Sequence, residues 1–248
     1  MLFQKSITSL GRYTLFMGKV CSKPNRWNVF WNRTVFEISK LGVDSIPLVI
    51  IISLFIGSVI TIQMQYNATS PLLPNYTVGL TAREIILLEF SNSILCLILA
   101  GKVGSNIASE IGTMRVTEQI DALDIMGVNS ANFLVLPKVV AFLFFMPVLV
   151  AFCIATSLMG GYLVALFTDI ISVSTYIYGI QTMFTEWYVW YGFIKSFFFA
   201  FIIASVSSYF GYYVQGGALE VGKASTSAVV TSSILILLFD VILTKLLL

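Results

Sequence analysis

Five long apolar segments dominate this sequence of 248 residues. A helix needs about 20 apolar residues to cross the hydrocarbon core of a bilayer, and each segment reaches that length. Charged residues make up only 10% of the chain, too few to cover the surface of a soluble domain of this size. The sequence therefore predicts an all-α integral membrane protein with five transmembrane helices, near 44–66, 84–106, 131–166, 188–212 and 226–247.

The chain is expected to form a single domain over 1–248, because it has no evident repeat and no linker rich in Pro, Gly or Ser. The third apolar segment, 131–166, is too long for one straight crossing. We expect it to tilt, protrude or bend, and Pro147 and Gly160-Gly161 are the predicted places for a bend.

Residues 1–42 form a basic, amphipathic segment that holds seven of the fourteen Lys and Arg residues. Pro24 divides it, and it lacks the compact apolar run and cleavage site of a signal peptide. In the second half, aromatic and aliphatic residues recur at roughly helical spacing against charged ones. This pattern is typical of a helix lying in the membrane interface, and the alternative is a cytosolic helix packed on its neighbours.

The positive charges are distributed unevenly between the loops. The N-terminal segment, the 2–3 connection and the 4–5 connection together hold eleven of the fourteen Lys and Arg residues. The loop at 67–83 has only Arg83, and the loop at 167–187 has none. The positive-inside rule then predicts a cytoplasmic N-terminus and, with five spans, an external C-terminus.

Several classes of function are excluded by what the sequence lacks. It has no His, and its three cysteines are widely separated, so neither a metal site nor a disulfide is predicted. No G-x-x-x-x-G-K-[ST] motif occurs, so ATP hydrolysis is not expected in this chain. A net charge of +2 gives no reason to expect nucleic-acid binding. Without His or paired intramembrane carboxylates, no catalytic cluster is identified.

Small residues form two stripes at the end of the second span. They allow close helix contact, and ordinary bundle packing explains them without any function. The stripes comprise Gly101, Ser105 and Ser109, and Gly104, Ala108 and Gly112.

The region after these stripes, 107–127, is predicted to carry a short, mostly acidic amphipathic helix over 110–124. Gly127 is its expected C-cap, and Ser130 is placed to cap the third span. Such a helix can insert into a groove of a cytoplasmic partner, or it can merely join two spans. The residues predicted to contact a partner are Glu110, Thr113, Met114, Arg115, Thr117, Glu118, Gln119 and Asp121.

Glu89 and Lys195 are ionisable residues well inside the predicted spans, where charge is costly and marks a candidate site. Glu89 and Lys195 lie at similar depth, about 8–12 Å below the outer surface at 1.5 Å per residue. We predict that they pair or face one cavity, either to meet a lipid headgroup or to fix helix packing. Gln63 is a third candidate, and Asp240 is expected near Lys245 as a snorkelling or capping residue.

The stretch 100–128, AGKVGSNIASEIGTMRVTEQIDALDIMGV, resembles the signature of the MlaE/YrbE permease family. Similar runs are Gly192-x-x-Lys195, Gly211-Tyr212, the segment 216–233 and the C-terminal Asp240-x-x-Leu-Thr-Lys-Leu-Leu. The resemblance covers about 40–248. Leu88 stands before Glu89 where many members have Arg, Lys102 replaces a frequent Arg, and Glu220 stands where Gly is common.

The resemblance implies the permease subunit of an ABC transporter that moves phospholipid or a related lipid between membranes. It implies a homodimer bound to a cytoplasmic ABC ATPase dimer through the 110–124 helix, an MCE-domain protein on the outer face and a small STAS-type regulatory subunit. No cofactor is expected on this chain, and ATP is used by the partner. The implied location is a bacterial inner membrane, or a plastid inner envelope. The alternatives are a stand-alone secondary transporter or channel, or a membrane scaffold for partner proteins.

Overall fold

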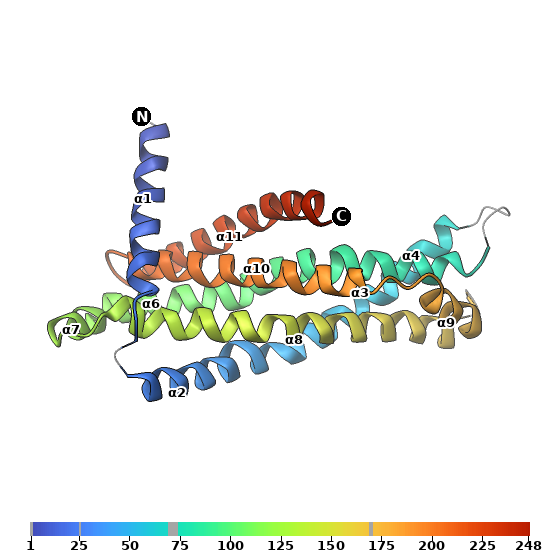
Figure 1. The fold of residues 1–248 in the computed structure, drawn as a ribbon, viewed down its shortest axis with the longest axis horizontal. Helices are drawn as coiled ribbons and strands as arrows, with labels where there is room; N and C mark the ends of the chain where they lie inside the picture. Colours follow the sequence, from blue (N-terminus) through green and yellow to red (C-terminus); the bar gives the residue numbers. More distant parts are fainter. Residues whose placement is uncertain (1, 25, 69–73, 169–170) are drawn as a thin grey trace.

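A computed structural model describes residues 2–24, 26–68, 74–168 and 171–248, with side chains from residue 11 onward. Every regular element in these ranges is helical. The helices form an elongated bundle, with the turn leading into α7 (Gln119–Ile125) at one end and α9 (Val173–Gln181) at the other (Figure 1). We refer to these as the α7 end and the α9 end.

Five helical runs are long and apolar enough to cross a membrane, which confirms the predicted fold class. Each extends past the predicted span at one end or both, because helices continue beyond the bilayer core. The runs are Trp27–Asn67, Thr77–Val116, Ser130–Phe167, Trp187–Tyr212 and Ala218–Leu247.

The first run joins α2 (Trp27–Glu37) to α3 (Ile46–Asn67) through the short turns η1 (Ile38–Gly42) and η2 (Val43–Ser45). The first run is thus continuous from the segment predicted to lie in the membrane interface to the first predicted span, and the interfacial position of α2 stays a prediction. The helix that does lie across the long axis of the bundle is α1 (Leu2–Val20), at the α7 end (Figure 1). The hydroxyl of Tyr13 on α1 donates to Ser205 Oγ at 2.7 Å, and burial raises the pKa of this phenol.

The second run comprises α4 (Thr77–Ile85), η3 (Ile86–Ile94), α5 (Leu95–Leu99), η4 (Ala100–Gly104) and α6 (Ser105–Val116). Both η3 and η4 have π-helical hydrogen bonding, which is rare and frequently marks functional segments. The run is continuous over 40 residues. It therefore connects the two ends of the bundle.

The third run is α8 (Ser130–Phe167), an unbroken helix of 38 residues that contains both Pro137 and Pro147. Asn129, rather than the predicted Ser130, is its N-cap and accepts a hydrogen bond from the Asn132 amide.

Close packing against α3, rather than a bend, explains the glycines of α8. A Cβ on Gly160 would lie 2.1 Å from the Leu54 carbonyl oxygen, and one on Gly57 would lie 2.0 Å from that of Ser157. Small residues that let two helix backbones approach are the usual solution within a membrane.

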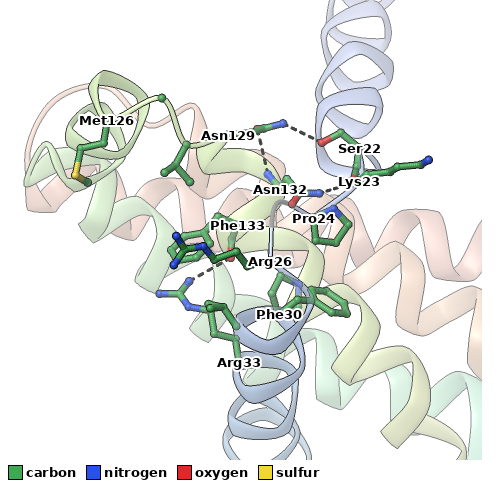
Figure 2. Close-up of a pocket in the computed structure, with 14 residues that line it drawn as sticks. Ser22, Lys23, Pro24, Arg26, Phe30, Arg33, Met126, Asn129, Asn132 and Phe133 are labelled. Atoms are coloured by element: carbon green, nitrogen blue, oxygen red, sulfur yellow. Dashed lines mark hydrogen bonds between the residues drawn. The ribbon is translucent and has the colours of Figure 1, made fainter.

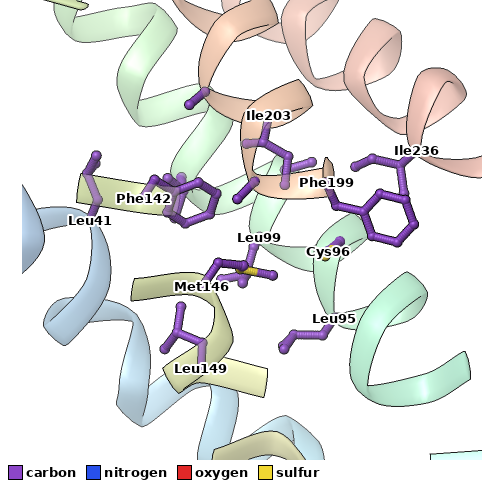
Figure 3. Close-up of a cluster of buried hydrophobic side chains, with 14 of the residues drawn as sticks. Leu41, Leu95, Cys96, Leu99, Phe142, Met146, Leu149, Phe199, Ile203 and Ile236 are labelled. Atoms are coloured by element: carbon purple, nitrogen blue, oxygen red, sulfur yellow. The ribbon is translucent and has the colours of Figure 1, made fainter. Parts of the chain in front are cut away.

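The last two runs are α10 (Trp187–Tyr212) and α11 (Ala218–Leu247). A core of buried apolar side chains joins α10 to α5 and α8 near the middle of the bundle (Figure 3). Much of the outer face of α11 is exposed and apolar, including Val230, Ile234, Leu238 and Val241. This face is available to lipid or to another protein.

Candidate functional site

Glu89 lies in the π-helical segment η3, part of the second run. The Asn92 side-chain amide donates to the Leu87 carbonyl at 3.1 Å, five residues back, which is a π-type spacing. The Ser93 hydroxyl donates to Glu89 Oε2 at 3.3 Å. Glu89 is therefore held in a segment whose hydrogen bonding departs from the α-helix.

Lys195 lies at the centre of a cluster of ionised side chains. Its side chain is completely buried, and its Nζ lies 2.6 Å from Asp240 Oδ1 and 3.7 Å from Glu89 Oε1. It also donates to Thr244 Oγ1 at 2.8 Å and lies 4.6 Å from the centre of the Tyr191 ring. We call Glu89, Lys195 and Asp240 the charge cluster; it joins η3, α10 and α11.

The charge cluster opens to the surface through one member. The Glu89 side chain is 47% exposed, whereas that of Asp240 is 14% exposed. Two carboxylates face one ammonium, so the closer Asp240 neutralises Lys195 and the exposed Glu89 remains a hydrogen-bond acceptor. This arrangement can bind a polar group that arrives from outside the bundle.

The predicted pairing of Glu89 with Lys195 is confirmed by this geometry. The expectation for Asp240 is wrong, because it faces Lys195 on α10 rather than Lys245 on its own helix. Asp240 and Thr244 are four residues apart and therefore share a helix face, a spacing that could have indicated a common partner. Gln63 is exposed on α3 and does not belong to the cluster.

The acidic segment at the α7 end is divided into two helices rather than one. Helix α6 ends at Val116, and the chain turns through Thr117 and Glu118 before α7 begins. Glu118 has a φ of 61°, in the left-handed region that non-glycine residues rarely adopt. The predicted single helix over 110–124 is therefore wrong, and we call residues 113–126 the elbow.

Two features determine how the elbow is held. Arg115 Nη1 lies 2.6 Å from Asp121 Oδ1, which braces α6 against α7 across the turn. Ile120 is fully buried, whereas Ile125 is 87% exposed and Met126 is 68% exposed. The tip of the elbow thus combines exposed acidic side chains with an exposed apolar pair, which is an unusual surface unless a partner covers it.

Glu110 does not belong to the elbow surface, contrary to prediction. Its Oε2 lies 2.8 Å from Lys138 Nζ and 2.9 Å from Lys40 Nζ. Lys138 is also 2.6 Å from Glu37 Oε1 and is only 2% exposed. These four residues form an ion-pair network that joins α2, η1, α6 and α8 near the elbow.

The stripe of Gly104, Ala108 and Gly112 packs closely, as predicted. A Cβ on Gly104 would lie 2.8 Å from Ser207 Oγ, and one on Gly112 would lie 3.1 Å from Val221. Ala108 meets Gly211 closely, and the Ser105 carbonyl accepts from Ser225 Oγ at 3.2 Å. A Cβ on Gly101, by contrast, would meet no described atom within 4 Å, so this residue is not needed for close packing.

Arg83, the only Lys or Arg of the loop at 67–83, has a structural role that the count of charges does not reveal. It is 1% exposed and donates to the carbonyls of Ile180, Thr182 and Met183 at 2.7, 2.8 and 3.2 Å. It therefore holds the segment after α9 against α4.

Comparisons with known proteins assign the chain to a family. The model of the family described as "Permease MlaE" matches residues 34–246, which include both the charge cluster and the elbow. The chain belongs to the MlaE permease family. This match begins within α2 and does not include α1.

Relatives of this MlaE family chain include two with permease names and one chloroplastic protein. A probable ABC transporter permease of Rickettsia bellii is 36% identical over 96% of this chain and 92% of its own length. A probable ABC transporter permease of Synechocystis is 32% identical over 80% of this chain and 75% of its own. The chloroplastic protein TRIGALACTOSYLDIACYLGLYCEROL 1 of Arabidopsis thaliana is 29% identical over 93% of this chain and 66% of its own.

Proposed function

We propose that this MlaE family permease is the membrane subunit of an ABC transporter that moves phospholipid or a related lipid. ATP hydrolysis takes place in a separate ATPase dimer, since this chain has no P-loop motif. The observation that carries the proposal is one continuous helical run, Thr77–Val116, that bears Glu89 of the charge cluster and ends at the elbow. A single element thus connects a candidate substrate contact to a candidate partner contact.

The lipid part of the proposal is supported by the position of the charge cluster. It lies towards the α9 end, since Lys195 is eight residues after the start of α10 and Asp240 is seven before the end of α11. A lipid headgroup carries hydrogen-bond donors or charge that the exposed Glu89 carboxylate can meet, while its acyl chains stay on the apolar helix surface. The name of the Arabidopsis relative, which contains a glycolipid, agrees with a lipid substrate.

The coupling part of the proposal is supported by the exposed elbow. Ile125 and Met126 supply an apolar anchor, and the exposed acidic residues Glu118, Asp121 and Asp124 surround it. A buried anchor within a polar rim is the usual composition of a protein interface. The ATPase binds here, and its movement passes into α6 through the Arg115–Asp121 ion pair.

The complete transporter contains two copies of this chain, the ATPase dimer, an MCE-domain protein at the α9 end and a small STAS-type subunit. The exposed apolar face of α11 supports contact with the second copy or with lipid. The transporter resides in a bacterial inner membrane with the basic α7 end in the cytoplasm, as the positive-inside rule requires; a plastid inner envelope is the alternative location.

The lipid function is tested by reconstituting the chain with its ATPase in liposomes and measuring ATP-dependent lipid transfer per folded molecule. Glu89→Gln should reduce transfer at least tenfold, which corresponds to about 1.4 kcal/mol or more of lost headgroup binding. Lys195→Met should also reduce transfer, because Lys195 is buried and its loss leaves Glu89 and Asp240 without their shared cation. Lys223→Gln, an exposed change on α11 away from the cluster, is the control. Normal transfer per folded molecule by both cluster variants, with only the folded yield reduced, would refute a substrate role.

The coupling function is tested by copurification with the ATPase. Ile125→Ser should reduce recovery of the ATPase without lowering thermal stability, because the Ile125 side chain is 87% exposed and packs on little of this chain. The matched control is Leu219→Ser, which changes another exposed apolar residue, at the start of α11. Lipid transfer in liposomes that contain no ATPase would instead support a stand-alone transporter.

A further inference from the structure

A cavity of about 780 Å³ lies at the α7 end, remote from the charge cluster. The segment between α1 and α2, the first turns of α2 and the connection from α7 into α8 form its walls (Figure 2). Apart from Met126, which also belongs to the elbow, the proposed transport function assigns no role to the residues that line this cavity. Its size suits a headgroup with part of an attached chain.

Hydrogen bonds fix the wall between α1 and α2. The Asn132 side chain donates to the carbonyls of Val20 and Ser22 at 2.8 and 2.6 Å. The Asn129 side chain donates to the Lys19 carbonyl at 3.1 Å and to Ser22 Oγ at 3.0 Å. The N-cap of α8 and a residue of its first turn therefore hold a segment that is more than a hundred residues away in the chain, so the cavity has a defined shape.

The ionised side chains of the lining are all cationic. Lys23, Arg26 and Arg33 contribute to it, and no described lining residue is a carboxylate. Figure 2 shows Arg26 and Arg33 on the same side of the cavity, near Phe133, while Lys23 points away from them. Arg33 Nη1 donates to the Phe133 carbonyl at 3.1 Å, and the guanidinium lies 3.7 Å from the centre of the Phe133 ring.

Arg33 is thus positioned by Phe133 with further N–H groups still free to donate. Arg26 is exposed and forms no ion pair with the part of the chain that the structure describes. It is also the N-cap of α2, whose first-turn N–H groups receive no side-chain cap. A pair of arginines beside uncapped amides favours an anion with several acceptor oxygens, such as a phosphate.

The lining also has an apolar part, which includes Val29, Phe30, Met126, Phe133 and Pro137. On α2, four large apolar residues are each more than half exposed: Trp27, Trp31, Val35 and Phe36. Exposed tryptophans beside cationic residues are typical of the level at which a helix meets lipid headgroups. The anion that fits here therefore brings an apolar part with it.

We propose that this cavity binds an anionic phospholipid of the leaflet at the α7 end, with its phosphate between Arg26 and Arg33. The acyl chains lie along Phe30 and the exposed face of α2. This lipid is a bound component that attaches α1 and α2 to the start of α8, and it is distinct from the transported lipid. The inference does not depend on the direction or the substrate of transport.

Native mass spectrometry of the detergent-solubilised full-length chain tests the proposal after addition of phosphatidylglycerol, phosphatidylcholine or inorganic phosphate. Phosphatidylglycerol should be retained at one molecule per chain, and phosphatidylcholine should be retained less. Arg26→Gln should weaken retention about tenfold, since a hydrogen bond to a charged group contributes that order of affinity. Arg12→Gln, the same change on α1 outside the cavity lining, should leave retention unchanged.

Three results would overturn the proposal. Equal loss of retained phosphatidylglycerol in both variants would mean that general surface charge, rather than this cavity, binds the lipid. Displacement of the lipid by millimolar inorganic phosphate, with equal retention of both phospholipids, would identify a site for free phosphate. Unchanged lipid retention by Arg26→Gln, together with reduced recovery of the ATPase, would identify a surface for a protein partner.

Discussion

Lys138→Met should destabilise the chain far more than removal of the neighbouring Lys40. Lys138 is 2% exposed and is the only cation within 4.0 Å of Glu37 among the described residues, at 2.6 Å. Glu110 keeps Lys40 at 2.9 Å after the substitution, but Glu37 becomes a buried carboxylate with no cation. Removing one partner of a buried ion pair costs about 3–5 kcal/mol, because the remaining charge is neither hydrated nor paired.

The matched control is Lys40→Met, which removes the same kind of side chain from the same network. Lys40 is 33% exposed, and Glu110 keeps Lys138 when it is lost, so the expected cost is at most about 1 kcal/mol. The free energy of unfolding of each variant is measured in detergent by denaturant titration, followed by circular dichroism. Glu37→Gln in the Lys138→Met background should restore about half of the loss, since it removes the unpaired charge.

The result that refutes this reasoning is an equal, small cost for Lys138→Met and Lys40→Met. It would show that water or lipid headgroups compensate Glu37 in solution. Failure of Glu37→Gln to restore stability would show that lost packing around the Lys138 stem, rather than the charge, causes the effect.

Three further predictions concern helix packing and the charges at the α9 end. Gly160→Ala should lower the free energy of unfolding by about 3 kcal/mol or more, because its Cβ would lie 2.1 Å from the Leu54 carbonyl oxygen. Gly222→Ala is the control: its Cβ would meet no described atom within 4 Å, so thermal unfolding should show no change or a gain of up to about 1 kcal/mol. Arg83→Met should leave the Ile180, Thr182 and Met183 carbonyls without their donor and lower the free energy of unfolding by about 3 kcal/mol. Hydrogen exchange of the backbone amides after α9 should become faster, and unchanged exchange there would contradict the role assigned to Arg83. Asp240→Asn should lower the folded yield more than Glu89→Gln, because Asp240 is nearer to Lys195 and less exposed, and the reverse order would assign Glu89 the structural role.

The sequence predicts the spans well because apolar length is a property of each segment by itself. The segments near 131–166 and 188–212 match α8 and α10 within one residue at each end. The pairing of Glu89 with Lys195 could be predicted from depth, since two charges at one level of a membrane protein need each other. The sequence predicts Lys245 rather than Lys195 as the neighbour of Asp240, because depth in the membrane does not reveal which helix a side chain faces.

The division of the elbow could not be predicted from periodicity. It depends on one residue, Glu118, in a left-handed conformation that its side chain does not signal, whereas a glycine there would have done so. The role of Glu110 depends on Lys138 and Lys40, which reach it from other helices. The cavity at the α7 end depends on Asn132 and its bonds to a segment 112 and 110 residues away. Contacts of this kind are visible only after the helices are placed.

The continuous run from Thr77 to Val116 also restricts how this chain can change in length. Glu89 lies on the helical run that leads into the elbow, so the angle between Glu89 and the start of the elbow is set by the number of residues between them. One inserted or deleted residue turns the rest of a helix by about 100°. An insertion between Leu95 and Val116 would keep every apolar residue and every charge, yet it would turn the elbow away from its partner or Glu89 away from Lys195. A deletion there would turn them in the opposite sense. We therefore expect substitutions to be tolerated in this stretch far more readily than insertions or deletions.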